Sequence, residues 1–212
     1  METYGVPVQS HLSENPNEIA WVKKLSPESR HYAGAYDRYG MLSENAVMAH
    51  AVYPEEEEIA LLAKRRTMIA HCPASNVNLR SGIAPIRRLL TAGVRVGLGS
   101  DVAGGECIDM LHAAADAIQV SKLYWRLIDR ECPALTFPEA FYMATKGGGA
   151  FFGKAGSFEP GYLFDALVLD DRALRTTREL TLPQRLERAL YLSGHIRLIQ
   201  KYVDAEPLFE EE

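Results

Sequence analysis

Short apolar runs alternate with longer amphipathic segments over the first half of the chain. Valine-rich runs this short, bounded by glycine, proline or polar residues, are typical of strands that are buried on both faces. Such runs predict strands at residues 5–11, 46–50, 68–72 and 94–99. Helical patterns lie between them at residues 16–25, 54–66 and 83–92. Strands and helices that alternate over short connections form right-handed βαβ units, so the pattern predicts a parallel sheet.

The second half of the chain has longer helical patterns and one isolated strand. We expect helices at residues 108–127 and 136–145, a strand outside the parallel sheet at 163–169, and one more helix within 184–202. Four parallel strands are half of what a closed (β/α)8 barrel requires. The sheet is therefore either open or the second half of a larger barrel.

Composition narrows the class of protein. With 47% hydrophobic and 24% charged residues, the chain has the make-up of a globular domain. Its net charge of −5, from 28 acidic and 23 basic residues, argues against a nucleic-acid-binding surface. The sequence has neither an apolar stretch of transmembrane length nor a secretory leader, and its three cysteines form no C-x-x-C pair. We expect a cytoplasmic protein without a membrane or nucleic-acid partner.

Each predicted strand is followed by a side chain that can bind a metal or move a proton. His11 ends the first strand and Glu14 follows it, His50 ends the second, His71 lies near the end of the third, and Asp101 follows the fourth. The carboxyl ends of parallel strands meet at one edge, where α/β proteins place their chemistry. Imidazole and carboxylate are ligands of zinc or iron, which acidify a bound water in hydrolytic centres. We therefore expect His11, Glu14, His50 and Asp101 to face one site.

Each of these residues also has a structural interpretation. Asp101 alone is equally consistent with a helix N-cap, although Gly104 and Gly105 after it let the backbone approach a ligand. For His71 we favour a structural or substrate-loop role, and for Cys72 a packing role. The acidic run 55–58 is expected to form a solvated helix face. The remaining histidines are expected at surface or packing positions, namely His31, His112 and His195.

Four motifs resemble those of the amidohydrolase superfamily. They are His-Leu-Ser-Glu at 11–14, Met-Ala-His at 48–50, His-Cys-Pro-Ala-Ser-Asn at 71–76 and Gly-Ser-Asp-Val-Ala-Gly-Gly at 99–105. The last is similar to the motif of the guanine deaminases within that superfamily. The resemblance implies that residues 1–155 form the C-terminal half of a (β/α)8 amidohydrolase barrel, strands five to eight. It also implies that residues 156–212 return to a small β-sandwich domain, and that the protein is a homodimer.

The resemblance further implies roles for single residues. His11 and Asp101 would bind the metal, which is zinc with iron as the alternative, and Asp101 would also handle a proton. Glu14 would shuttle a proton to the purine, and His50 would orient the attacking hydroxide and stabilise the tetrahedral intermediate. The implied reaction is the zinc-dependent hydrolysis of guanine to xanthine and ammonia.

Two further residues, Ser75 and Asn76, are implied to lie in a substrate-side loop and to bind the purine. The sequence also departs from the superfamily, because no His-x-His pair occurs in it. We therefore expect a C-terminal portion that is inactive alone and that requires a complementary N-terminal half. The alternatives are an 8-oxoguanine or adenosine-type aminohydrolase, or a catalytically dead half barrel that acts as an interaction module.

Overall fold

The computed structural model describes residues 5–210 and contains the predicted parallel sheet. Its strands are β1 (Val8–Leu12), β2 (Ala46–His50), β3 (Met68–His71) and β4 (Arg95–Leu98), and they pair in chain order. In the register, Leu12 lies opposite His50, and His71 lies opposite Leu98. The carboxyl ends of all four strands therefore meet at one edge of the sheet.

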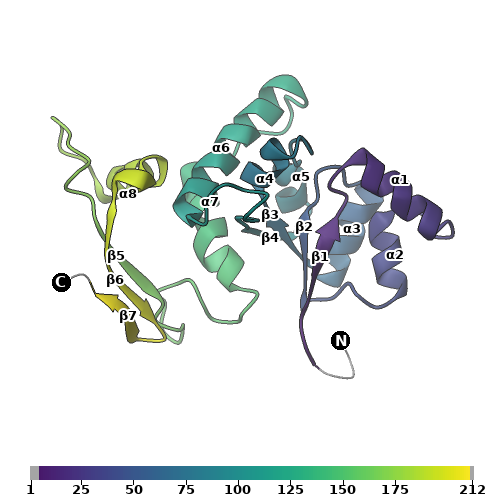
Figure 1. Ribbon diagram of the computed structural model, residues 1–212, viewed down its shortest axis with the longest axis horizontal. Helices are drawn as coiled ribbons and strands as arrows, with labels where there is room; N and C mark the ends of the chain where they lie inside the picture. Colours follow the sequence, from purple (N-terminus) through teal and green to yellow (C-terminus); the bar gives the residue numbers. More distant parts are fainter. Residues whose placement is uncertain (1–4, 211–212) are drawn as a thin grey trace.

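Helices α1 (Pro16–Leu25), α3 (Glu56–Arg65) and α5 (Ile86–Thr91) lie within the predicted helical segments. Two short helices were not predicted, α2 (Tyr32–Arg38) and α4 (Pro73–Asn78). Helices of seven and six residues are too short to show an amphipathic period. His31 caps α2 by accepting a hydrogen bond from the Gly34 amide at 3.0 Å. Figure 1 shows α1, α2 and α3 beside β1 and β2 at one end of the sheet.

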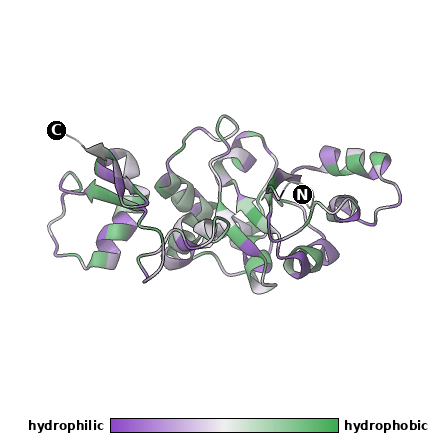
Figure 2. Cartoon of the chain, turned by 90° about the horizontal axis from the view of Figure 1, so that it is seen from below, coloured by the Kyte–Doolittle hydropathy of each residue, from purple (hydrophilic) through white to green (hydrophobic). Residues whose placement is uncertain are grey.

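The core lies between the parallel sheet and its helices. Met48 and Ile69 on the strands are fully buried, as are Leu62 on α3 and Leu89 on α5. Burying a side chain of this size stabilises the fold by about 1.5–3 kcal/mol. Figure 2 shows hydrophobic colouring on the strands at the centre of the molecule.

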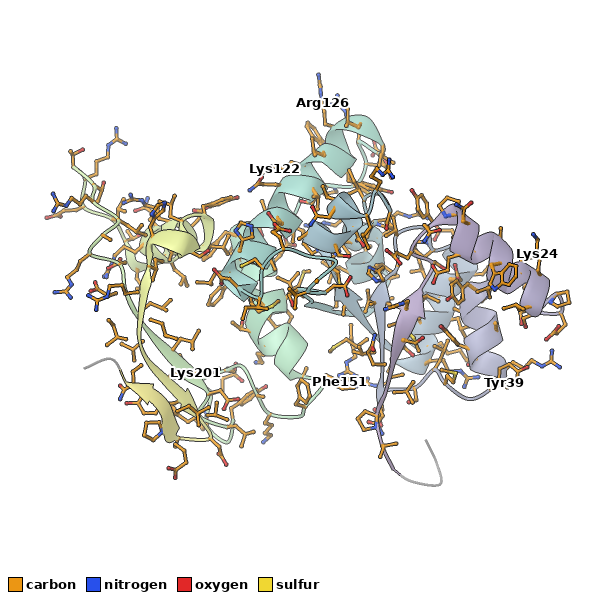
Figure 3. All side chains as sticks on the ribbon, in the orientation of Figure 1. Lys24, Tyr39, Lys122, Arg126, Phe151 and Lys201 are labelled. Atoms are coloured by element: carbon orange, nitrogen blue, oxygen red, sulfur yellow. The ribbon has the colours of Figure 1, made fainter. Side chains whose placement is uncertain are left out.

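The α-helical part of the helix predicted at 136–145 is shorter than expected. Helix α7 (Phe137–Tyr142) continues into a π-helical turn, Met143–Gly147, which packs on β4. A Cβ atom on Gly97 of β4 would lie 2.9 Å from the Cα atom of Gly148, so the two backbones approach closely here. Helix α6 (Met110–Leu127) buries alanines on this side, whereas Lys122 and Arg126 extend from its outer face (Figure 3).

The predicted isolated strand lies in a separate antiparallel sheet. Strands β5 (Ala166–Asp170), β6 (Arg197–Val203) and β7 (Glu206–Glu210) form it, and α8 (Leu182–Tyr191) packs on α6. The segment 184–202 thus contains the expected helix, but its last part forms β6. The run Leu198-Ile199 followed by Tyr202-Val203 favours a strand, because β-branched and aromatic residues fit a pleated surface. Among residues 5–210, no helix is both long and apolar enough to cross a membrane.

The acidic run at the start of α3 is only partly the solvated face that the sequence predicted. Glu58 is 2% exposed, and its carboxylate is the central acceptor of this corner of the fold. It accepts hydrogen bonds from the Ala33 amide at 2.7 Å, the Glu55 amide at 3.0 Å and the Ser13 hydroxyl at 3.2 Å. One buried charge therefore joins the end of β1 to the first turns of α2 and α3.

We predict that Glu58→Ala lowers the free energy of unfolding by about 3 kcal/mol, because it leaves several buried donors without an acceptor. Denaturant unfolding measures the change. The matched control is Glu57→Ala, which removes an exposed carboxylate of the same helix and costs less than about 1 kcal/mol. Equal losses in the two variants would contradict the role given to Glu58.

Candidate active site

The backbone is strained where the parallel strands end. Ser13, His50 and Asp101 have φ angles of 47°, 75° and 46°, in the left-handed region that residues other than glycine seldom adopt. These residues follow or end β1, β2 and β4. Strained backbone of this kind concentrates at functional sites, so the edge that the sequence predicted as the site also has the geometry of one.

His50 is the residue on which the predicted site residues converge. Its Nε2 atom lies 3.9 Å from Glu14 Oε2 and 3.9 Å from Asp101 Oδ2. The ring of His11 lies edge-on to it, with 5.2 Å between ring centroids. Asn76 Oδ1 lies 2.9 Å from His50 Nδ1, so this nitrogen donates the hydrogen bond and Nε2 faces the carboxylates. The structure thus brings His11, Glu14, His50 and Asp101 together.

Glu14 is held by a residue that the sequence did not indicate. The Ser81 hydroxyl donates a hydrogen bond of 2.7 Å to Glu14 Oε1. This leaves Oε2 facing His50. Ser81 lies in the loop after α4 and far from Glu14 in the sequence, so no local pattern links the two residues.

The loop after β4, which contains Gly104 and Gly105, packs closely against Asp101 and α4. A Cβ atom on Gly104 would lie 2.7 Å from Ser75 Oγ and 2.9 Å from Asp101 Oδ2, and one on Gly105 would overlap the Ser100 carbonyl oxygen. Glycine at these two positions therefore lets the loop close over Asp101 and α4.

The proposed purine-side residues are buried in α4 rather than placed in a loop. Ser75 and Asn76 are 0% and 1% exposed. Among residues 5–210, Ser75 Oγ, Asn76 Nδ2 and both ring nitrogens of His71 are buried without a hydrogen-bond partner. Buried polar atoms are normally satisfied by a hydrogen-bond partner or an ordered water, so these atoms are candidates to meet a ligand or a water at this edge of the sheet.

Burial also sets the charge state of two neighbouring groups. It lowers the pKa of His71 to about 3, with the nearby His50 adding to the effect. The ring is therefore neutral at physiological pH. Burial, helped by the charge of Asp101, raises the pKa of the Cys72 thiol to about 12. This thiol is a packing group and not a nucleophile, as the sequence predicted.

The side chains at this edge are of a type that binds zinc, but there are fewer of them than zinc takes. An imidazole and a carboxylate, from His11 and Asp101, are ligands that zinc accepts, but zinc in proteins takes about four. Within the described residues, the one group of three metal-binding side chains whose ligand atoms all lie within 4.8 Å of one another is elsewhere, at Glu106, His112 and Asp116. The edge therefore offers ligands of a type that zinc accepts, in a smaller number than zinc takes.

Parallel α/β proteins have their functional sites at the carboxyl ends of the strands. This chain has imidazole and carboxylate groups at those ends, so it belongs to that class of α/β proteins. Comparison with family models narrows the class, since residues 1–197 match the model of the amidohydrolase family. The chain belongs to the amidohydrolase family.

Relatives place the chain more closely within the family. It is 42% identical over 172 residues to a probable guanine deaminase of Schizosaccharomyces pombe, covering 80% of this chain and 33% of that protein. The structure of guanine deaminase from C. acetobutylicum with bound guanine matches with a TM-score of 0.91 at 44% identity, covering 98% of this chain and 50% of that one. The chain therefore spans half or less of the length of these relatives.

A zinc-bound structure is also similar. An adenosine deaminase from Xanthomonas campestris with bound zinc has a TM-score of 0.83 at 25% identity, over 99% of this chain and 46% of that one.

We predict that Gly104→Ala destabilises the protein by about 1–3 kcal/mol, because the added methyl group displaces Ser75 or the Asp101 carboxylate. Thermal or denaturant unfolding gives the value. The control is Gly194→Ala, where no heavy atom lies within 4 Å of the added Cβ. Equal stability of the Gly104→Ala and Gly194→Ala variants would contradict the close packing described for this loop.

Proposed function

We propose that this chain is the C-terminal half of a guanine deaminase barrel, with residues 1–155 forming strands five to eight of a (β/α)8 barrel. In this proposal residues 156–212 form the returning part of a small β-sandwich domain. The support is the parallel sheet in chain order, the separate antiparallel sheet, and the match of nearly the whole chain to half of a guanine deaminase.

The function that we propose is the hydrolytic deamination of guanine to xanthine and ammonia. The observation that carries it is the convergence of Glu14 and Asp101 on His50 Nε2 at 3.9 Å each. Two carboxylates and an imidazole supply what hydrolysis of an amino-substituted ring needs, which is a base for water, a donor to the ring and a donor to the leaving amine. The identity of the purine follows from the guanine deaminase relatives.

His11 and Asp101 would hold the zinc ion, which when bound acidifies water and so supplies the nucleophile at neutral pH. Glu14, held by Ser81, transfers a proton from the water to a ring nitrogen of the purine. His50, fixed by Asn76, presents Nε2 to the oxygen that adds to the amino-bearing carbon. Asp101 would take the proton of the hydroxyl group that has added to the ring and pass it to the amino group, which leaves as ammonia.

Side chains of α4 would contribute to the binding of the purine. Ser75 Oγ and Asn76 Nδ2 are buried and have no partner among the described residues, so they are available to pair with the polar edge of the ring. A purine has donors and acceptors around its whole periphery, and a site built to bond them rejects rings that lack them.

Activity in this proposal depends on a second segment. The sequence has no His-x-His pair, and two of about four metal ligands bind zinc weakly. We therefore expect the isolated chain to be inactive, and a segment that supplies barrel strands one to four to restore activity.

The experiment joins this chain to the part of the C. acetobutylicum guanine deaminase that precedes the matched half, in one polypeptide so that association is not limiting. We predict release of ammonia and xanthine from guanine by the fusion and none by the chain alone. Adenosine and 8-oxoguanine serve as competing substrates. Turnover of either one without turnover of guanine would contradict the assignment of substrate, and full activity of the isolated chain would contradict the need for a second segment.

We predict that Glu14→Gln in the same fusion lowers kcat by about 10²–10⁴-fold, because the proton shuttle is lost. The control is Glu57→Gln on the outer face of α3, which leaves kcat unchanged. If the Glu14→Gln variant kept its kcat, Glu14 would not be the proton shuttle.

A further inference from the structure

A second group of metal-binding side chains lies outside the proposed active site. Glu106 lies in the loop that follows β4, and His112 and Asp116 lie one turn apart on α6. His112 Nε2 is 3.6 Å from Glu106 Oε1 and 3.6 Å from Asp116 Oδ2. One imidazole nitrogen is thus flanked by two carboxylate oxygens from different parts of the chain.

These separations fit ion pairs, and they are also compatible with ligands of one ion. A hydrogen bond between a ring nitrogen and an oxygen measures about 2.7–3.2 Å, so 3.6 Å is too long. Two ligand atoms about 2.1 Å from a tetrahedral zinc ion lie about 3.4 Å apart. The two separations from His112 are therefore compatible with an ion held between the three side chains, whose ligand atoms all lie within 4.8 Å of one another.

A neighbouring amide orients the Glu106 carboxylate, and one oxygen of the Asp116 carboxylate is buried without a donor from the described residues. Asn78 Nδ2 donates to Glu106 Oε2 at 3.0 Å and to the Gly104 carbonyl at 3.1 Å, which leaves Glu106 Oε1 facing His112. Asp116 Oδ2 is buried, and among residues 5–210 it has no hydrogen-bond partner. Carboxylate ligands of metals are held by hydrogen bonds of the kind that Asn78 supplies, and a buried carboxylate oxygen is costly unless a cation or donor meets it.

We propose that Glu106, His112 and Asp116 bind a divalent transition metal ion of the zinc type. A His with two carboxylates leaves a fourth position for water, as in three-ligand zinc sites. The ion ties the loop containing Gly104 to the first turns of α6 and so holds the segment that closes over Asp101. This site uses none of the ligands assigned to the active centre, and it stands or falls independently of the proposed reaction.

The test uses the full chain with His11→Ala and Asp101→Asn, so that the active-site ligands are absent. After treatment with a chelator, this background is titrated with Zn²⁺ alone by isothermal calorimetry. We expect one equivalent to bind, and His112→Ala to weaken that binding at least tenfold. The matched control is His195→Ala, which removes another exposed histidine and leaves binding unchanged.

Circular dichroism confirms that each variant is folded. Should His112→Ala unfold the chain, Glu106→Gln decides the question, because its side chain is 54% exposed and contributes little to packing. Failure of the background to bind Zn²⁺, or equal affinity in the His112→Ala and His195→Ala variants, would overturn the site.

Discussion

The buried carboxylate of Glu58 is the constraint on which the geometry of the site depends. It accepts hydrogen bonds from the amides that begin α2 and α3 and from Ser13. Ser13 is thereby held in its left-handed conformation, and its carbonyl oxygen accepts from the amides of Val52 and Tyr53. The end of β1 and the loop after β2 are locked together, so Glu14 and His50 have one relative placement. The buried carboxyl group of α3 thus fixes the ends of two strands relative to each other.

The strained backbone at the strand ends depends on this support. A residue other than glycine in the left-handed region costs on the order of 1 kcal/mol, and Ser13, His50 and Asp101 all adopt it. Local preference alone would relax these residues. The hydrogen bonds of Glu58 at Ser13, of Asn76 at His50 and the close packing of Gly104 at Asp101 hold them in place. The strained backbone lowers the stability of this edge, and it fixes the directions in which the side chains point.

The parallel sheet and its polar edge can be predicted from the sequence, because both are determined by the local order of apolar and polar residues. Apolar runs identify the strands, and the residues that follow them are adjacent in the sheet by topology. Contacts between distant segments leave no such pattern. The bond from Ser81 to Glu14 and the burial of Glu58 in an acidic run are both set by tertiary packing. Strand β6 was not predicted although its own residues fit a strand. Its pairing with β5 and β7 is a contact between separate segments, which the sequence pattern did not reveal.

The proposed second segment would meet two requirements at once. Within the described residues, β1 and β4 each pair on one side only, so the sheet has two open edges at which backbone groups lack strand partners. The same sheet has His11 and Asp101 on its outermost strand ends, which are the ends nearest to any added strands. Strands that closed the barrel would pair with β1 and β4 and would bring further metal ligands next to these two residues. In this proposal, one partner would both cover the sheet edges and complete the metal site, so the metal would bind most tightly in the form whose edges are covered.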